Sequence, residues 1–232
     1  MRAAVLIIGS LLWREGSRAT WRKDRLDLRG MQYVRVPIRY RRRSQNQTYT
    51  MGFASHGFGV AVAVPCRHRL DDFASLLEEA RELWKAEDSM AGDTGIISKN
   101  WGAVGILFRR GLKQSNVAKA WADYSNKNLA EPVGRTFVSD EGALEISWPK
   151  TTGGEPVNFD VLFATGNAVH NPRAPTVAKA WLAHGGEEYF FNNVAAGIQT
   201  PLDGAIWQHL SSRPWRRKYR RAIDALRKQE AP

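Results

Sequence analysis

The feature that most constrains the fold is an apolar run near the N-terminus, Ala3 to Ile8, which ends in Gly9-Ser10-Leu11-Leu12-Trp13. Six consecutive apolar residues with β-branched members, followed by glycine and a small hydroxyl residue, predict a buried strand that stops in a tight turn. Glycine lets the main chain approach a ligand closely, and backbone N–H groups at a strand end can bind a carboxylate or an oxyanion. The run therefore predicts either an ordinary core strand or one wall of a binding site.

Strands and helices do not alternate regularly along the rest of the chain. Residues with β-branched and aromatic side chains, punctuated by glycines, predict further strands at 33–42, 48–54, 58–64, 102–110, 143–148 and 157–164. Helical spacing of apolar residues predicts helices at 70–87, 115–128, 175–184, 187–196, 201–211 and 214–229. We therefore expect one α+β domain over residues 1–232 rather than a doubly wound parallel sheet, with residues 200–232 as a basic C-terminal helical extension.

Composition excludes several classes of protein. A hydrophobic content of 43%, with nine Trp, excludes a disordered chain, and the single cysteine, Cys66, excludes a disulfide framework and a cysteine-based metal cluster. The five histidines show no metal-ligand spacing, so no metal is expected. Arg2 precedes an apolar segment, but no small-residue cleavage site follows, and no run approaches the roughly 20 residues of a membrane span. We expect a soluble, cytoplasmic protein that binds no membrane.

The formal net charge of +11 is concentrated near the C-terminus. Residues 213–228 contain eight basic side chains and one acidic residue, Asp224. Helical spacing places Trp215, Tyr219 and Leu226 on one side of this segment and most of its cations on the other. Such a helix either docks by its aromatic stripe and leaves its charges in water, or it contacts the phosphates of a nucleic acid.

One carboxylate in the predicted helix 70–87 differs from its neighbours in orientation. Glu87 lies four residues after Leu83 and three after Trp84, which places it on the apolar face at the helix C-terminus. Partial burial and the negative end of the helix dipole both raise the pKa of such a carboxyl, as a general acid or base near neutral pH requires. Glu82 lies opposite Phe73 and should face solvent. If the helix ends before Glu87, that side chain points into water instead.

The turn and the acid together resemble the gamma-glutamylcyclotransferase-like family, most closely its ChaC-type branch. In that family a first strand ends in Tyr-Gly-Ser-Leu-(Ile/Leu)-Trp, which residues Gly9 to Trp13 match in order, with Ile8 in place of the tyrosine. Arg41-Arg42-Arg43 is similar to the family's arginine-rich strand. Ala164-Thr165 and Tyr189 are similar to parts of its late segment.

The resemblance also implies a catalytic residue and a fold. The family's catalytic glutamate ends a Leu-x-x-x-Glu pattern, which Leu83 and Glu87 match. Glu82 is the second choice, because Arg81-Glu82 is similar to an Arg-Glu pair common in the ChaC branch. The implied fold is a mixed, partly closed β-barrel-like sheet flanked by helices, followed by a helical C-terminal part.

The reaction that the resemblance implies is intramolecular aminolysis of a γ-glutamyl amine or peptide, which gives 5-oxoproline and a free amine without a cofactor. In this hypothesis Glu87 is the general acid and base, and the backbone of Ile8, Gly9, Ser10 and Leu11 binds the glutamyl group. The alternative is a non-catalytic binding protein of the same fold, whose basic C-terminal helix contacts nucleic acid.

Overall fold

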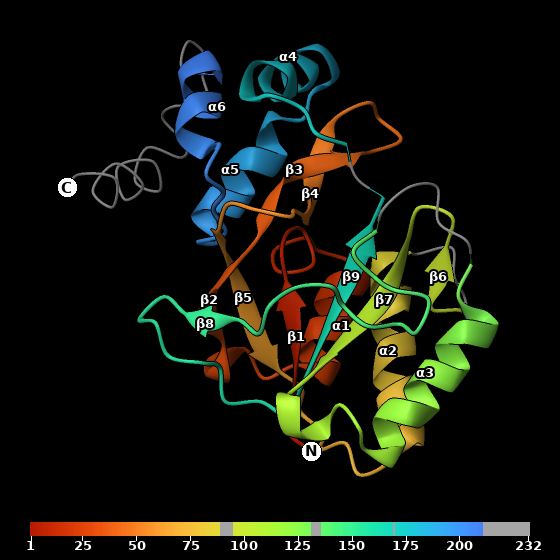
Figure 1. The fold of residues 1–232 in the computed structure, drawn as a ribbon. Helices are drawn as coiled ribbons and strands as arrows, with labels where there is room; N and C mark the ends of the chain where they lie inside the picture. Colours follow the sequence, from red (N-terminus) through yellow and green to blue (C-terminus); the bar gives the residue numbers. More distant parts are fainter. Residues whose placement is uncertain (89–94, 131–135, 169, 211–232) are drawn as a thin grey trace.

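A computed structural model of the protein describes residues 1–88, 95–130, 136–168 and 170–210 (Figure 1). Its main sheet has seven strands in the order β6-β7-β9-β1-β5-β2-β8, and β3 and β4 form a separate two-stranded sheet. The strands are β1 (Ala3–Ile7), β2 (Gln32–Val36), β3 (Ile38–Arg43), β4 (Tyr49–Phe53), β5 (Gly59–Pro65), β6 (Ser98–Lys99), β7 (Gly102–Phe108), β8 (Lys150–Thr151) and β9 (Val161–Asn167). The helices are α1 (Ser17–Arg25), α2 (Phe73–Glu87), α3 (Asn116–Asn128), α4 (Ala174–His184), α5 (Glu187–Ala195) and α6 (Asp203–Leu210).

The first predicted strand, β1, lies near the middle of the main sheet. It pairs in parallel with β9 and antiparallel with β5, and all five of its residues are buried. A strand with neighbours on both sides and both faces covered must be apolar throughout, which explains the unbroken apolar run. The prediction of a buried strand that ends just before Gly9 is confirmed.

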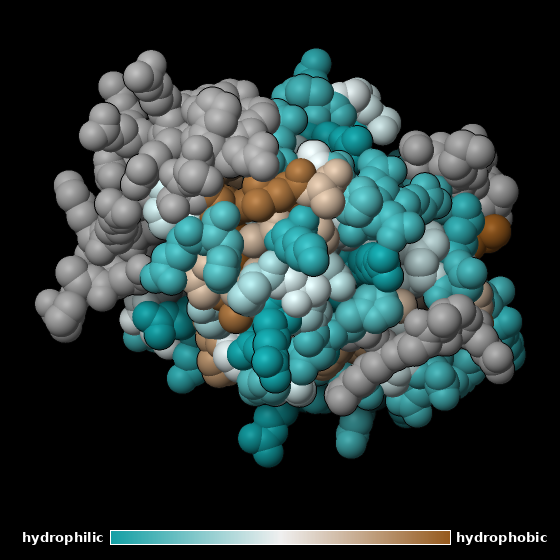
Figure 2. Space-filling view, turned by 90° about the horizontal axis from the view of Figure 1, so that it is seen from above, coloured by the Kyte–Doolittle hydropathy of each residue, from teal (hydrophilic) through white to brown (hydrophobic). Residues whose placement is uncertain are grey.

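Helices cover the sheet in two groups (Figure 1). The long helix α2 packs against β7 and β9, and α1 and α3 contact α2. Helices α4, α5 and α6 gather at the other end of the molecule, where α4 also contacts β4. Seen from above, the described surface is mostly hydrophilic, with a hydrophobic area near the middle of the view and smaller hydrophobic spots elsewhere (Figure 2).

The main sheet is not closed into a barrel, which corrects the expectation of a partly closed, barrel-like sheet. Its edge strands, β6 and β8, are two residues long and lie at opposite ends of the strand order. Pro37 interrupts the predicted strand 33–42, because proline has no N–H to donate to a ladder. The chain after Pro37 pairs with β4 instead of continuing in the main sheet, where the two-residue strand β8 follows β2 at the edge.

Most of the other predicted elements are found, with two main differences, and one further prediction is not tested. The segment 143–148 forms isolated bridges, such as Ala143 with Ile106, and no strand. Helix α1 was not expected, because its sequence has only one large apolar residue, Trp21, which is buried. The predicted helix 214–229, and with it the basic surface of the nucleic-acid alternative, lies outside the described residues.

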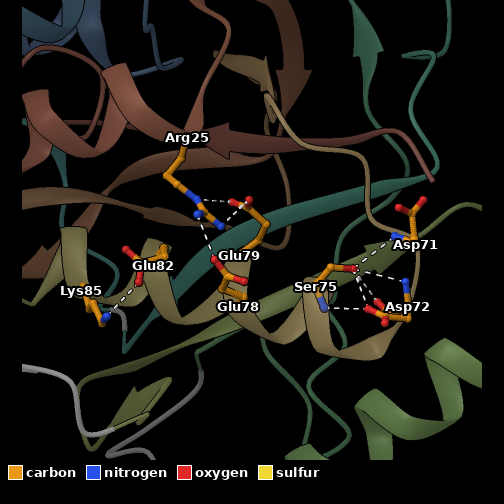
Figure 3. A network of polar contacts seen from close by, with 8 residues as sticks. All are labelled: Arg25, Asp71, Asp72, Ser75, Glu78, Glu79, Glu82 and Lys85. Carbon is orange, nitrogen blue, oxygen red and sulfur yellow. Dashed lines mark hydrogen bonds and ion pairs between the residues drawn. The ribbon is translucent and has the colours of Figure 1, made fainter.

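Helix α2 begins three residues later than the predicted helix 70–87, at a capping box, and ends at the predicted residue, Glu87. The side chain of Asp72 accepts a hydrogen bond from Ser75 N at 2.8 Å, and Ser75 Oγ bonds back to Asp72 N at 3.2 Å, which forms a capping box (Figure 3). The helix continues through Glu87, and Asp88 is extended. The last turn, on which the prediction for Glu87 depends, is therefore helical.

The described part of the chain contains no helix that is long and apolar enough to span a membrane.

Candidate active site

A cavity of about 400 Å³ lies where β1 ends. Its walls come from the turn after β1, helix α1, the β3–β4 hairpin, the end of α2, strand β9 and helix α5. Polar and charged groups dominate the lining, which includes Ser10, Arg14, Arg18, Arg42, Glu87, Asp88, Trp101, Thr165, Asn167 and Tyr189. The predicted binding residues Ile8, Gly9, Ser10 and Leu11 line the same cavity as Glu87.

The turn after β1 is held by its own backbone and by an arginine of α1. Leu12 N donates to Gly9 O at 3.0 Å, and Arg14 N donates to Ser10 O at 2.9 Å. The buried Arg22 guanidinium donates to Leu11 O at 2.6 Å and to Arg14 O at 2.8 Å. These bonds use the carbonyl groups of the turn, whereas the N–H groups of Ser10 and Leu11 have no acceptor among the described residues. The turn thus offers fixed, unpaired donors beside the cavity.

Gly9 is needed because a tyrosine hydroxyl lies directly against it. A Cβ atom at position 9 would be 2.4 Å from Tyr189 Oη, a distance that side-chain carbons do not reach. Tyr189 Oη accepts a hydrogen bond from Met51 N at 3.1 Å, and its ring meets that of Trp13 edge-on, with centroids 5.6 Å apart. The Trp13 indole in turn donates to Asn193 Oδ1 at 2.8 Å. Helix α5 therefore supplies a phenolic hydroxyl to the cavity from a position about 180 residues after the turn.

Of the two acids that line this cavity, Glu87 and Asp88, Glu87 is the predicted one. It is the last residue of α2, and its side chain is 16% exposed. Burial raises its pKa above the usual range, and the nearby guanidinium groups of Arg18 and Arg42 oppose that rise. Arg18 Nη2 lies 3.5 Å from Glu87 Oε2. The pKa of Glu87 is thus set by two opposing effects, and a raised carboxyl pKa favours the proton transfer that a general acid or base performs.

Another part of the cavity wall carries a cation on an aromatic stack. The Arg42 guanidinium lies over the Trp101 ring at 4.3 Å from its centroid, and Trp101 stacks on the buried Trp84 at 4.8 Å. A cation–π contact of this kind restricts the orientation of the guanidinium. Arg42 is therefore an oriented cation in the cavity wall. Asp88, which also lines the cavity, forms an ion pair with Lys99 at 2.5 Å.

One buried acceptor in the cavity wall has no partner. Asn167 is 6% exposed, and its Oδ1 atom has no hydrogen-bond donor among the described residues. A buried polar atom without a partner is unfavourable unless a bound molecule satisfies it. The cavity thus presents a carboxylate, an amide oxygen and several cations to a ligand. Among the residues that the structure describes, no group of three or more His, Cys, Asp or Glu side chains is arranged to hold a metal ion.

The second-choice acid, Glu82, is not among the residues that line the cavity. It forms an ion pair with Lys85, with Oε1 2.8 Å from Nζ, on the outer side of α2 (Figure 3). A second buried acid of α2, Glu79, was not predicted from the sequence. It is 3% exposed and bonded to Arg25 Nη2 at 2.7 Å. Burial raises the Glu79 pKa, and the ion pair with Arg25 limits that rise. Glu79 lies three residues after Leu76 and four before Leu83, so the same helical spacing that selected Glu87 could have identified it.

Arg18, Trp101 and Asn167 were also not identified from the sequence. Trp101 and Asn167 come from strands or loops distant in sequence from the turn, and no local pattern marks them. Arg18 belongs to helix α1, which was not predicted, so no helical spacing indicated which way its side chain points.

Fold and site together define an α+β protein with an open mixed sheet and a polar cavity lined by two mostly buried acidic side chains, Glu87 and Asp88. A scan against protein-family models finds no match, and searches of curated proteins and of solved structures find no similar protein.

Proposed function

We propose that the protein is an enzyme of the gamma-glutamylcyclotransferase type, which converts a γ-glutamyl amine or peptide to 5-oxoproline and a free amine. The observation that carries this proposal is the position of Glu87 in the same cavity as the Gly9–Leu11 turn. The two elements are separated by more than 70 residues of sequence, yet the fold brings a carboxyl with a raised pKa to a turn with unpaired N–H groups. That combination suits acyl transfer at a carbonyl group.

The proposed reaction needs one group to move protons between two nitrogens. The α-amino nitrogen of the substrate gives a proton to Glu87 and attacks the γ-carbonyl carbon, which forms the ring C–N bond and an oxyanion. Collapse of this intermediate breaks the original amide bond. The two protons lost by the attacking ammonium end on the leaving nitrogen, which departs as an ammonium, and the reaction consumes no water. Holding both nitrogens near one carboxyl is the main task of such a site.

Other groups in the cavity fit the remaining parts of a γ-glutamyl substrate. The unpaired N–H groups of Ser10 and Leu11 can bind the developing oxyanion, and Asn167 Oδ1 can accept a hydrogen bond from the substrate amine. Arg42 can bind a carboxylate of the substrate. Ile8 brings no hydroxyl to the end of β1, but Tyr189 Oη lies against Gly9 and supplies one from α5.

The proposal is tested by incubating the purified full-length protein with a panel of γ-glutamyl amines and peptides and measuring 5-oxoproline. A positioned base contributes about 10²- to 10⁴-fold in rate, so Glu87→Gln should lose at least that part of the activity. Glu82→Gln is the matched control, because it makes the same change on the same helix outside the cavity, and it should keep the wild-type rate. Absence of product with every substrate, or equal losses in both variants, would refute the proposal.

A further inference from the structure

The side chain of Arg18 donates hydrogen bonds to both the turn after β1 and the end of α2. Its Nη1 atom donates to Ser10 Oγ at 3.3 Å. Its Nε and Nη2 atoms donate to Ala86 O at 2.9 Å and to Glu87 O at 3.2 Å. Nη2 also lies 3.5 Å from the Glu87 carboxylate. A single guanidinium thus contacts both walls of the cavity.

The geometry at the end of α2 explains why an arginine suits this position. The last carbonyl groups of a helix have no partner inside the helix and carry the negative end of its dipole. Glu87 adds a carboxylate at the same end, so three negative groups lie close together there. A guanidinium has five donors in a rigid fork, and Arg18 uses this fork to bond Ala86 O, Glu87 O and Ser10 Oγ together. A lysine ammonium in its place cannot span the same acceptors.

We propose that Arg18 is a positioning residue, which fixes the end of α2 against the Ser10 turn and directs the Glu87 carboxyl group at the cavity. The role in turnover rests on the proposed function, whereas the effect on the carboxylate does not. Arg18 holds the proton acceptor and the binding turn at a set distance from each other. Substrate binding and proton transfer therefore depend on a helix, α1, that takes no part in the sheet.

Several other groups face Glu87 and set the background against which Arg18 acts. Arg42 from β3 lowers the pKa of Glu87, and Thr165 from β9 lines the same cavity. Tyr189 from α5 is close enough for the Glu87 charge to contribute to its raised pKa. Burial has the largest effect on Glu87 and raises its pKa, and Arg18 is the strongest of the opposing groups. Loss of Arg18 should therefore raise the pKa of Glu87 further.

The experiment follows Glu87 directly by carbon-13 NMR of the full-length protein labelled at glutamate carboxyls, with Glu87→Gln used to assign the signal. Arg18→Met removes the charge and keeps most of the side-chain stem. Lys23→Met makes the same change of charge at an exposed position of the same helix, away from the cavity. An opposite charge at this distance typically shifts a carboxyl pKa by about 1–3 units, so we expect the Glu87 midpoint in Arg18→Met to rise by at least about one pH unit. The Lys23→Met midpoint should equal that of the wild type.

A second variant separates charge from position. Arg18→Lys keeps the cation, so the Glu87 midpoint should stay close to the wild-type value. Its single ammonium cannot hold both walls, so kcat should fall by about tenfold, as expected for a small misplacement of a catalytic group. In Arg18→Met the acidic limb of the rate profile should move to higher pH together with the NMR midpoint.

The outcomes distinguish this inference from the proposed function. An unchanged Glu87 midpoint in Arg18→Met refutes the inference even if the wild-type protein forms 5-oxoproline. A raised midpoint with no product from any substrate supports the effect on the carboxylate and refutes the proposed function. Wild-type kcat and KM in Arg18→Lys refute the positioning role. If Arg18→Met does not fold, the titration and kinetics of Arg18→Lys decide between these outcomes.

Discussion

The contact between Gly9 and Tyr189 leads to a prediction whose size follows from the structure. In Gly9→Ala the new Cβ would lie 2.4 Å from Tyr189 Oη, whereas ordinary contact begins at about 3.4 Å. The tyrosine or the turn must therefore shift by about 1 Å. A shift of that size breaks the 3.1 Å hydrogen bond from Met51 N to Tyr189 Oη. Overpacking of this kind costs about 1–3 kcal/mol of folding stability, of which the lost hydrogen bond accounts for about 1 kcal/mol.

The assay is a double-mutant cycle in urea, with the free energy of unfolding measured for wild type, Gly9→Ala, Tyr189→Phe and the double variant. Without the hydroxyl, the nearest tyrosine atom to the new Cβ is Cζ at 3.5 Å, which is an ordinary contact. Gly9→Ala should then cost little in the Tyr189→Phe background, with a coupling energy of about 1 kcal/mol or more. The effect of alanine on the unfolded chain is the same in both backgrounds and cancels. If Gly9→Ala is equally destabilising in both backgrounds, the hydroxyl is not the reason for the glycine.

Two further predictions concern the buried acids of α2. The folded-state pKa of Glu87 is raised above its ordinary value of 4.5, so ionisation of this carboxyl is less favourable in the folded than in the unfolded protein. The free energy of unfolding is therefore lowered as pH rises above 4.5. Glu87→Gln should therefore have a higher Tm than wild type at pH 7 and an equal Tm near pH 4; a lower Tm at pH 7 would contradict this. Arg25→Met leaves the Glu79 carboxylate buried without its cation and should cost about 3–5 kcal/mol at pH 7, measured in urea, and less at pH 5, where Glu79 can take up a proton. Glu78→Ala is the control for this pair, because Glu78 is 62% exposed and its removal should cost less than about 1 kcal/mol; similar losses in both variants would argue against a buried pair.

The parts of the fold that the sequence predicts are those controlled by local spacing. The unbroken apolar run gives β1, and the apolar positions of 70–87 give both the length of α2 and the inward orientation of Glu87. Ser115 likewise marks the start of α3, where its hydroxyl accepts from Ala118 N. In each case the residues that decide the structure lie within a few turns or one strand of each other, so their periodicity carries the information.

The openness of the sheet could not be predicted in this way. Whether a sheet closes depends on whether its edge strands meet, and β6 and β8 are too short to leave a periodic signal. The proline at position 37 was visible in the sequence, but its effect depends on the pairing partners available on either side. Here β2 pairs with β5 and β8, whereas the chain after Pro37 pairs with β4.

The site shows the same division between local and distant information. Spacing identified Glu87 and the Gly9–Leu11 turn separately, but the groups that join them come from elsewhere in the chain. Tyr189 reaches Gly9 from α5, and Arg18 reaches Glu87 from a helix whose sequence has almost no apolar pattern. A polar residue that acts by bonding two distant elements leaves no periodic trace, because its position is set by their packing.

The contacts of Arg18 also connect the stability of the protein to the proposed chemistry. A carboxylate at a helix C-terminus is unfavourable twice, through burial and through the dipole, and a chain selected for stability alone would not keep Glu87 there. Arg18 offsets part of that cost by bonding the helix carbonyls and the carboxylate together, but its own pKa is lowered chiefly by burial, so it too is held in an unfavourable environment. Arg18 and Glu87 are both mostly buried, and each offsets part of the free-energy cost of burying the other. Such a pair at the wall of a polar cavity is better explained by a requirement for a charged group at that place than by folding. Substitution of either residue should therefore affect activity and the free energy of unfolding differently. Substitution within an ordinary ion pair would affect stability without a separate effect on activity.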